Sequence, residues 1–474
     1  MKILLIIPPN IHYIEPYSYI KADKNNAIRP CLGLLYVAAA VRKVSGIEIR
    51  IIDCNIDNLD LAGLRQIIKN EQPDIVGFSV LTFNILNCIE VARIIRQISP
   101  LTKICFGGWH PTLYPQETLK LDCVDYIVIG EGEHSFSELV GHCMNKPQTE
   151  QYPVNIKGIG FKTSLGEIKI NPPSGPIKNL DDLPLPAYDL IKTGKYSNLL
   201  ARSEKVINLI TSRGCPQRCI FCDIRGTLYR FRSPKNVLEE IKYWVNNGIR
   251  EFFILDDNFT INRKRTIEFC KLLIESGLRV KYKISSRVDY LDDELLKYLK
   301  KSGCYLIYFG VESGVQKILD YFEKGTTIAQ IKNVFKLCKK RGIDRFAYIM
   351  IGAPEETYKD IEMTLGLIKE IKPQHLHCSV CTPMPKTYFY QKLLAQGSIK
   401  HDYWREFADS PNPNFKTPFC SRFFSDKELR SIQNAIERDF YLNPRIIFQE
   451  IIKTRGVKQL VTKARLAFNV FSNN

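Results

Sequence analysis

Long hydrophobic runs are missing from this sequence of 474 residues. The longest apolar stretches, such as Ile3–Ile7 and Ile207–Ile210, are far shorter than the roughly 20 residues of a membrane-spanning helix. No signal-peptide cleavage pattern follows the first strand-like run, which leads directly into Pro8 and Pro9. Internal repeats and low-complexity stretches are also absent. We therefore expect a cytoplasmic globular protein.

A disulfide framework is not expected, although the chain has 15 cysteines. Most of them stand alone within apolar runs, as Cys54, Cys105 and Cys270 do, which is typical of small buried side chains. The cytoplasm is reducing and keeps such thiols free. Only one group of cysteines has the close spacing of a ligand set.

The charge balance is basic, with 67 Lys and Arg against 50 Asp and Glu and a net charge of +17. This balance favours an anionic partner, which could be nucleic acid, a phosphorylated substrate or an anionic membrane surface. It does not choose among them.

Strand-like and helical segments alternate over residues 1–145. Continuous apolar strands separated by helices predict a parallel sheet that is covered on both faces. Ligands of such a Rossmann-like sheet bind beyond the carboxyl ends of its strands. The expected strands are residues 3–7, 48–53, 74–80, 103–107 and 126–129.

A proline-rich segment, residues 146–200, interrupts this alternation and predicts a linker with a short hairpin near residues 158–170. About six further strand–helix units follow over residues 201–400. They predict a partial or full barrel with its site at the C-terminal strand ends. Residues 401–474 form a third, mainly helical region. Its basic and apolar end, residues 443–474, predicts either a helix packed on the barrel or a peripheral membrane contact.

Cys215, Cys219 and Cys222 follow directly on a predicted strand, with Cys-x3-Cys-x2-Cys spacing. Three thiolates can hold three irons of a 4Fe–4S cluster and leave the fourth iron open. A zinc site would need a fourth protein ligand, and His110 and His134 are distant in the sequence. The triad therefore predicts an iron–sulfur cluster.

With Phe221 as its aromatic position, this triad resembles the signature of the radical S-adenosylmethionine (SAM) enzymes. The resemblance implies a (β/α)6-type barrel in which SAM binds the open iron and is cleaved to a 5′-deoxyadenosyl radical. It also implies an electron donor such as flavodoxin or ferredoxin. Motifs at four later strand ends resemble the SAM contacts of that family, although two acids replace the common Gly-Gly-Glu after the second strand. The SAM-binding residues implied are Asp256, Asp257, Ser286, Arg287, Glu312 and Gly352.

Residues 1–10, 30–40 and 130–133 resemble the cobalamin-binding domain of the cobalamin-type members of this family. The resemblance implies that cobalamin lies at the sheet edge, with its nucleotide tail near a few small or hydroxylated residues. The Asp-x-His-x-x-Gly motif that supplies a cobalt ligand is absent. We therefore expect no histidine on cobalt, with His12 as the alternative, or else a degenerate domain without corrin. The implied tail contacts are Ser79, Thr82, Gly107 and Gly108.

The expected protein is an α/β enzyme with a cobalamin-binding domain (1–145), a linker (146–200), a radical SAM barrel (201–400) and a helical C-terminal region (401–474). The resemblance implies C-methylation or radical cyclisation of a small molecule or lipid that is large and apolar or polycyclic, such as a hopanoid, a tetrapyrrole or another natural product. An RNA-modifying radical enzyme and a non-catalytic corrin-binding protein are the alternatives. The chain has no separate RNA-binding module, so no nucleic acid partner is expected, and no catalytic residue can be assigned.

Overall fold

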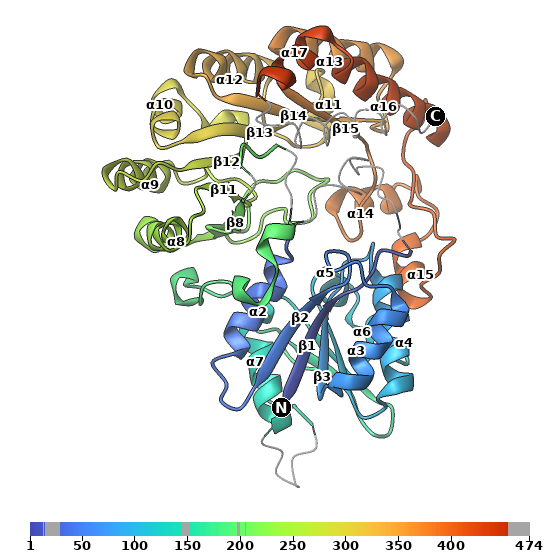
Figure 1. The fold of residues 1–474 in the computed structure, drawn as a ribbon. Helices are drawn as coiled ribbons and strands as arrows, with labels where there is room; N and C mark the ends of the chain where they lie inside the picture. The colour runs from blue at the N-terminus through green and yellow to red at the C-terminus, as the bar shows by residue number, and fades with distance from the viewer. Residues whose placement is uncertain (13, 15–28, 145–151, 197–199, 204, 454–474) are drawn as a thin grey trace. The chain divides into compact units, whose positions relative to one another are not determined.

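The computed structural model describes residues 1–453 except 13, 15–28, 145–151, 197–199 and 204 (Figure 1). The described residues fall into two compact units. The first takes its residues from Met1–Pro16, Pro30–Tyr196 and His401–Thr417. The second takes its residues from Tyr17–Arg29, Ser197–Lys400 and Pro418–Asn474.

A seven-stranded sheet forms the centre of the first unit, in the order β2-β1-β3-β4-β5-β6-β7. The first five strands are parallel, and β6 and β7 add an antiparallel hairpin to the edge at β5. The strands are β1 (Lys2–Ile7), β2 (Glu48–Asp53), β3 (Ile75–Ser79), β4 (Lys103–Gly107), β5 (Tyr126–Val128), β6 (Ile159–Lys162) and β7 (Ile168–Ile170).

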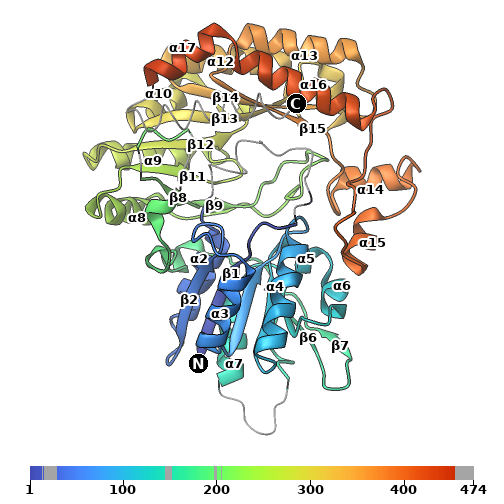
Figure 2. The ribbon, with the colours of Figure 1, turned by 45° about the vertical axis from the view of Figure 1, so that its right-hand side comes forward.

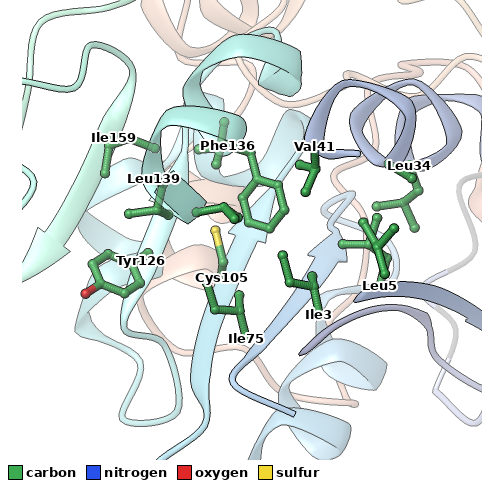
Figure 3. Close-up of a cluster of buried hydrophobic side chains, with 14 of the residues drawn as sticks. Ile3, Leu5, Leu34, Val41, Ile75, Cys105, Tyr126, Phe136, Leu139 and Ile159 are labelled. Carbon is green, nitrogen blue, oxygen red and sulfur yellow. The ribbon is translucent and has the colours of Figure 1, made fainter. Parts of the chain in front are cut away.

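Helices cover both faces of this sheet because its parallel strands are apolar on both sides. Both ribbon views place α2 and α7 on one face and α3 and α4 on the other (Figures 1 and 2). On the first face, Leu34 of α2 and Phe136 of α7 pack with Leu5 and Cys105 in one buried cluster (Figure 3). The helices are α2 (Leu32–Val41), α3 (Leu61–Glu71), α4 (Ile85–Ile98), α5 (Trp109–Leu113), α6 (Pro115–Lys120) and α7 (Gly132–Met144).

A short helix from the C-terminal part of the chain, α15 (Tyr403–Asp409), also packs within the first unit. Lys120 pairs with Asp409 at 2.7 Å, and Arg405 pairs with Glu117 at 3.2 Å. Trp404 is fully buried, with its ring edge-on to that of Phe83. The region after residue 400 is therefore divided between the two units.

Six parallel strands form the sheet of the second unit, in the order β15-β14-β13-β12-β11-β8. Side chains alternate across the sheet. Phe309 packs against Phe335 of a covering helix, so Tyr308 lies on the opposite, inner face. The strands are β8 (Ile207–Leu209), β11 (Glu251–Ile254), β12 (Lys281–Ser286), β13 (Cys304–Glu312), β14 (Asp344–Ile351) and β15 (His375–Val380).

Most helices of the second unit begin at side-chain caps, such as the reciprocal pairs Thr327 with Gln330 and Thr357 with Asp360. Every helix in the described part of the chain is too short or too polar to cross a membrane. The helices are α8 (Pro234–Asn246), α9 (Arg263–Glu275), α10 (Asp293–Lys301), α11 (Gln316–Tyr321), α12 (Ile328–Arg341), α13 (Tyr358–Ile371), α14 (Tyr388–Ala395), α16 (Asp426–Tyr441) and α17 (Pro444–Lys453).

Helix α16 covers the exposed edge of β15 with polar side chains. Gln433 donates to the carbonyl of Cys378 at 2.7 Å, and Tyr441 donates to that of Leu376 at 2.7 Å. Glu437 accepts from His377 at 2.9 Å and from the backbone of Cys378 at 3.2 Å. These contacts satisfy backbone groups on the outer edge of β15, which could otherwise pair with another strand.

Candidate active site

The three closely spaced cysteines lie on one loop, residues 214–229, which we call the cysteine loop. It joins two short antiparallel strands, β9 (Ser212–Arg213) and β10 (Arg230–Phe231). Gly214 opens the loop with φ +85°, and a Cβ there would lie 2.3 Å from the carbonyl oxygen of Leu228. Only glycine fits this position, because both the backbone angle and the space exclude a side chain.

Asp256, at the end of β11, supports the base of the cysteine loop. Its carboxylate accepts from the backbone N–H groups of Thr211 at 2.6 Å and Ser212 at 3.0 Å. It also accepts from both of their hydroxyls, at 2.5 and 2.7 Å. The side chain is buried, so these four hydrogen bonds engage both of its oxygens. The SAM contact predicted for Asp256 stays a prediction, and the contacts observed give this residue a positioning role.

The far end of the cysteine loop is held between two other segments. The backbone N–H of Ile220 donates to the carbonyl of Phe322 at 3.0 Å. The carbonyl of Ile220 accepts from the backbone N–H of Phe389 at 2.9 Å. Phe221, the aromatic residue of the motif, packs edge-on against Phe322 with ring centroids 5.3 Å apart. The loop therefore keeps its shape through contacts that do not involve a bound group.

The triad offers a donor set that fits an iron–sulfur cluster. Cys219 is buried, whereas Cys215 and Cys222 keep partial access to solvent. Burial raises the pKa of the Cys222 thiol to about 12 and also raises that of Cys215, so both favour the neutral form until a cation binds. Among the described residues, no three His, Cys, Asp or Glu side chains converge on a single-ion site. The thiolates of a cubane bind three different irons and need no such convergence.

Asp257 is the accessible carboxylate beside the cysteine loop. Unlike Asp256 it is exposed, and the surrounding protein raises its carboxyl pKa to about 6, with a further contribution from the charge of Asp256. Asn258, next in sequence, is buried, and its side-chain nitrogen has no partner among the described residues. The sequence placed Asn258 at this strand end but assigned it no role. Its place in the same run of polar residues at a strand end was the available signal.

Ser286 and Arg287 end β12, as predicted. The Ser286 hydroxyl lies 2.6 Å from that of Thr260, and both are buried. The Arg287 guanidinium donates to the sulfur of Cys219 at 3.5 Å. The structure therefore brings Arg287 to the cysteine triad itself.

Glu312 lies at the end of β13, with φ +63°, an angle that non-glycine residues seldom adopt. Its carboxylate pairs with Lys324 at 2.7 Å, and both side chains are largely buried. The Lys324 ammonium also lies 5.7 Å from the ring centroid of Phe221. The ion pair therefore connects the end of β13 with the cysteine loop. No pattern in the sequence pointed to Lys324.

Gly352 follows β14 in a turn with φ +86°. A Cβ there would lie 2.4 Å from Leu429 of α16, and the Gly352 carbonyl accepts from the Cys420 thiol at 3.7 Å. Glu356 accepts from the backbone N–H groups of Gly352 at 2.5 Å and Ala353 at 3.2 Å. The implied SAM contact at Gly352 therefore lies in a turn that is braced by Glu356 and covered by the C-terminal part of the chain.

Glu356 also predicts a pH dependence of stability. Burial raises its pKa to about 7, although the two N–H groups act in the opposite direction. Between about pH 4.5 and 7 the folded chain holds a proton that the unfolded chain has lost, so this group's stabilisation falls as pH rises through that window. The Glu356→Gln variant lacks this titration. We therefore expect its free energy of unfolding, relative to that of the native chain, to rise by up to about 3 kcal/mol as the pH increases from 5 to 8.

Thermal unfolding at the two pH values measures this change. Glu355→Gln is the matched control, because that side chain is about half exposed and pairs with Arg422 at the surface. A stability difference for Glu356→Gln that is the same at both pH values would contradict the shifted pKa.

In the first unit, Ser79, Gly107 and Gly108 lie at the carboxyl ends of β3 and β4. Gly108 has φ +99°, and a Cβ there would lie 2.9 Å from the carbonyl of Val80. Thr82 is buried, and its hydroxyl lies 3.1 Å from Nδ1 of His110. Burial lowers the pKa of His110 to about 3, so the ring is neutral, and its Nε2 has no partner among the described residues.

Large apolar side chains are exposed at the same sheet edge. Ile11, Leu81 and Trp109 follow β1, β3 and β4 and are 48%, 44% and 40% exposed. We call these three residues the apolar edge. Exposed apolar groups beside unpartnered polar atoms suit a flat macrocycle with a polar tail, so this edge fits a corrin.

His12 is turned away from a ligand role. Its Nε2 lies 3.1 Å from the carboxylate of Glu90 on α4. Its backbone N–H donates to Asn87 at 2.7 Å, and its carbonyl accepts from the same amide at 2.7 Å. These contacts occupy the ring and backbone of His12 and agree with the prediction that His12 does not bind cobalt. That ligand assignment stays a prediction.

The basic C-terminal segment predicted for residues 443–474 is described only up to α17. Residues 454–474 lie outside the described residues. Within the described part, Arg445 donates to the carbonyl of Lys372 at 3.3 Å. That contact places the start of the segment on the second unit.

Two family models match the chain. The Radical SAM superfamily model matches residues 209–368, and the B12 binding domain model matches residues 27–140. The chain is 31% identical over 461 residues to the "uncharacterized methyltransferase" of Pyrococcus horikoshii, with 96% of each chain covered. It is 30% identical over 447 residues to the anaerobic magnesium-protoporphyrin IX monomethyl ester cyclase of Rubrivivax gelatinosus, covering 93% of this chain and 78% of that one.

Solved structures share the fold over nearly the whole chain. The cobalamin-dependent SAM radical enzyme OxsB, with aqua-cobalamin and SAM bound, matches with a TM-score of 0.73 at 18% identity, covering 98% of this chain and 70% of that one. The radical SAM methyltransferase TsrM of Kitasatospora setae, with cobalamin and a 4Fe-4S cluster bound, matches with a TM-score of 0.71 at 16% identity, covering 94% and 89%. At these identities the likeness shows the fold alone.

Proposed function

The chain belongs to the cobalamin-binding radical SAM enzymes, and on that premise we propose that it methylates an unactivated carbon of a large apolar or polycyclic molecule. Its cofactors are a 4Fe–4S cluster, SAM and cobalamin. When bound, these groups supply SAM cleavage and methyl-transfer chemistry, and the protein supplies binding, orientation and exclusion of water.

The chain's own residues divide this work between the two units. The cysteine loop, with Asp256 beneath it, would hold the cluster. Asp257, Ser286, Glu312 and Gly352, at the strand ends of the second unit, are proposed to contact SAM. Ser79, Thr82, Gly107 and Gly108 in the first unit are proposed to lie near the cobalamin tail.

The aromatic inner face of the second sheet is the observation that carries the substrate class. Tyr308 packs against Phe253, Phe346 and Tyr348 with ring centroids 5.2, 4.9 and 6.1 Å apart. Lys283 is the buried cation on this face, with its ammonium 4.8 Å from the Phe253 ring. These rings belong to a buried cluster on the inner face of the sheet, and such ring faces suit contact with an apolar substrate that has flat or extended faces. The relatives named as a tetrapyrrole cyclase and a hopanoid C-3 methylase support the same class.

Radical cyclisation is the second candidate, because the similarity to the Rubrivivax cyclase covers most of the chain. The two reactions differ in their SAM products. Methylation of an unactivated carbon consumes two SAM molecules and yields both S-adenosylhomocysteine and 5′-deoxyadenosine, whereas cyclisation yields 5′-deoxyadenosine without S-adenosylhomocysteine. Either reaction requires a reductant, for which we propose flavodoxin or ferredoxin. A contact of the basic C-terminal segment with an anionic membrane is part of the same proposal.

The test uses the full chain, purified without oxygen and reconstituted with iron, sulfide and cobalamin. It is incubated with methyl-labelled SAM and with small-molecule, lipid and RNA extracts from a strain that lacks the gene. We expect label in a new apolar product and formation of S-adenosylhomocysteine. A new product without label or S-adenosylhomocysteine would replace methylation with cyclisation. Products confined to RNA would overturn the substrate class.

Glu312 provides a test of the proposed SAM contacts. We expect Glu312→Gln to weaken SAM binding by roughly tenfold or more, because the lost charge-assisted hydrogen bond contributes about 1.5–3 kcal/mol. The iron content should not change, since the cysteine loop keeps its other contacts. Glu323→Gln is the control, because that glutamate pairs with Arg225 at the surface. Equilibrium dialysis of SAM gives the comparison. If Glu312→Gln binds SAM with native affinity but is less thermally stable, the role of Glu312 would be the structural ion pair with Lys324 and not a SAM contact.

A further inference from the structure

Arg287 makes the one direct contact between the β12 end and a cysteine sulfur that the structure describes. Its Nη1 donates to Cys219 Sγ at 3.5 Å, and both residues are buried. This is within hydrogen-bonding range for sulfur, which is a larger acceptor than oxygen. The guanidinium stays charged at any pH at which the protein is folded.

Asp289 holds the guanidinium in this position. Its two carboxylate oxygens accept from Nε at 3.0 Å and from Nη2 at 2.8 Å. Those two bonds occupy one edge of the planar guanidinium and leave Nη1 directed at the sulfur. The hydroxyl of Tyr290, the residue after Asp289, accepts a hydrogen bond from the side-chain amide of Gln217 in the cysteine loop at 2.5 Å. Residues 287–290 therefore hold the cysteine loop at two points.

A cation and a hydrogen bond at a ligating thiolate change the energy of an iron–sulfur cluster. Reduction adds one negative charge to the cluster, and a buried positive group beside a ligand sulfur stabilises the reduced form more than the oxidised form. Net charge and hydrogen bonds to the sulfurs are among the factors that set the potentials of these clusters. The burial of both partners strengthens the effect, because little solvent screens the charge.

We propose that Arg287 is a positioning residue that acts through Cys219 to raise the reduction potential of the cluster. This inference rests on the proposed assignment of the cluster to Cys215, Cys219 and Cys222. It also gives Arg287 a role different from the SAM contact that the sequence resemblance implied. Asp289 shares the role, because it fixes the direction of the guanidinium.

The experiment is a potentiometric titration of the reconstituted full chain, followed by electron paramagnetic resonance without SAM. Arg287→Met removes both the charge and the donor at similar length, and Arg287→Lys keeps the charge alone. Asp289→Asn releases the guanidinium. Arg225→Met is the matched control. It removes a cation from the cysteine loop that donates to the Arg218 carbonyl at 2.8 Å and pairs with Glu323, without an observed contact to a sulfur.

For Arg287→Met we expect the equilibrium constant for one-electron reduction to fall at least tenfold, which is a shift of about 59 mV to more negative potential. Arg287→Lys and Asp289→Asn should shift the potential less, and Arg225→Met should leave it near the native value. SAM affinity and iron content should stay native in all four variants.

A native potential in both Arg287 variants, or an equal shift in Arg225→Met, would overturn the proposal. A native potential together with lost SAM affinity in the Arg287 variants would instead support the SAM contact that the sequence resemblance implied for Arg287. If Arg287→Met fails to take up iron, Arg287→Lys decides by the same criterion. Failure of the native chain to form a cluster would instead refute the assignment of the triad, so the two failures are distinguishable.

Discussion

Replacement of Cys219 with alanine is expected to abolish SAM cleavage and to remove most of the bound iron. Cys219 is the buried member of the triad and the one in contact with Arg287. A cubane that loses one of three protein ligands loses the geometry that leaves a single iron open for SAM. We expect 5′-deoxyadenosine formation to fall at least a hundredfold, as measured by chromatography after anaerobic reconstitution and reduction with dithionite.

The scaffold around Cys219 makes this test specific. Both backbone groups of Ile220 are bonded to neighbouring segments, so the loop can keep its path when the sulfur is removed. Cys270→Ala is the control, because Cys270 is equally buried in the same unit and its thiol lies 3.8 Å from the Tyr282 hydroxyl. It should lose some stability and keep its iron. Substantial SAM cleavage by Cys219→Ala would refute the cluster assignment.

The family, the fold class and the cofactors were predictable from the sequence because they depend on local patterns. Aliphatic runs such as Ile3–Ile7 can be read within a single segment, and so can the spacing of the triad. The comparisons confirm the radical SAM enzyme with a cobalamin-binding domain that these patterns predicted. About six strand–helix units were predicted over residues 201–400, and the second sheet has six parallel strands within that range.

The details of the site were less predictable because they depend on contacts between residues far apart in the chain. Asp256 and Asp257 are adjacent residues of the same type. Asp256 is nevertheless buried and accepts four hydrogen bonds, whereas Asp257 is exposed. Strand register and loop path create that difference. Arg287 reaches Cys219 across 68 positions of sequence. No pattern within a short window could indicate these contacts.

Segments with weak patterns were the least predictable. The predicted hairpin is present as β6 and β7, but its antiparallel pairing with β5, which makes it part of the first sheet, was not expected of a linker. The region after residue 400 reads as one helical segment, but α15 packs within the first unit and α16 within the second. The buried Trp404 against Phe83 and the ion pair of Lys120 with Asp409 are among the contacts that hold α15 in the first unit. The sequence alone does not show which charges will meet.

Gly108 shows how a predicted ligand residue can have a structural requirement of its own. Small size was expected to give the cobalamin tail room, but the residue's φ of +99° and the Val80 carbonyl already exclude a side chain. A bulky substitution at Gly108 would therefore disturb the loop whether or not a corrin binds. The apolar edge offers a cleaner test, because its side chains are exposed and can be changed without altering the fold.

Leu81→Asp is expected to weaken cobalamin binding at least tenfold, which is about 1.4 kcal/mol. The substitution places a charge on the surface that would contact the apolar face of the corrin, and that charge loses its hydration when the ligand binds. Binding is measured from the visible spectrum of cobalamin titrated with the full chain under anaerobic conditions. Circular dichroism should stay native, because Leu81 is 44% exposed.

Leu101→Asp is the matched control. Leu101 is also an exposed leucine of the first unit, at 90%, but it precedes β4 and therefore lies at the amino end of that parallel strand. It should bind cobalamin as the native chain does. Equal cobalamin affinity in the two variants would show that the corrin does not contact the apolar edge. If neither variant nor the native chain retains cobalamin while SAM cleavage persists, the proposed methyl transfer through this domain would be excluded.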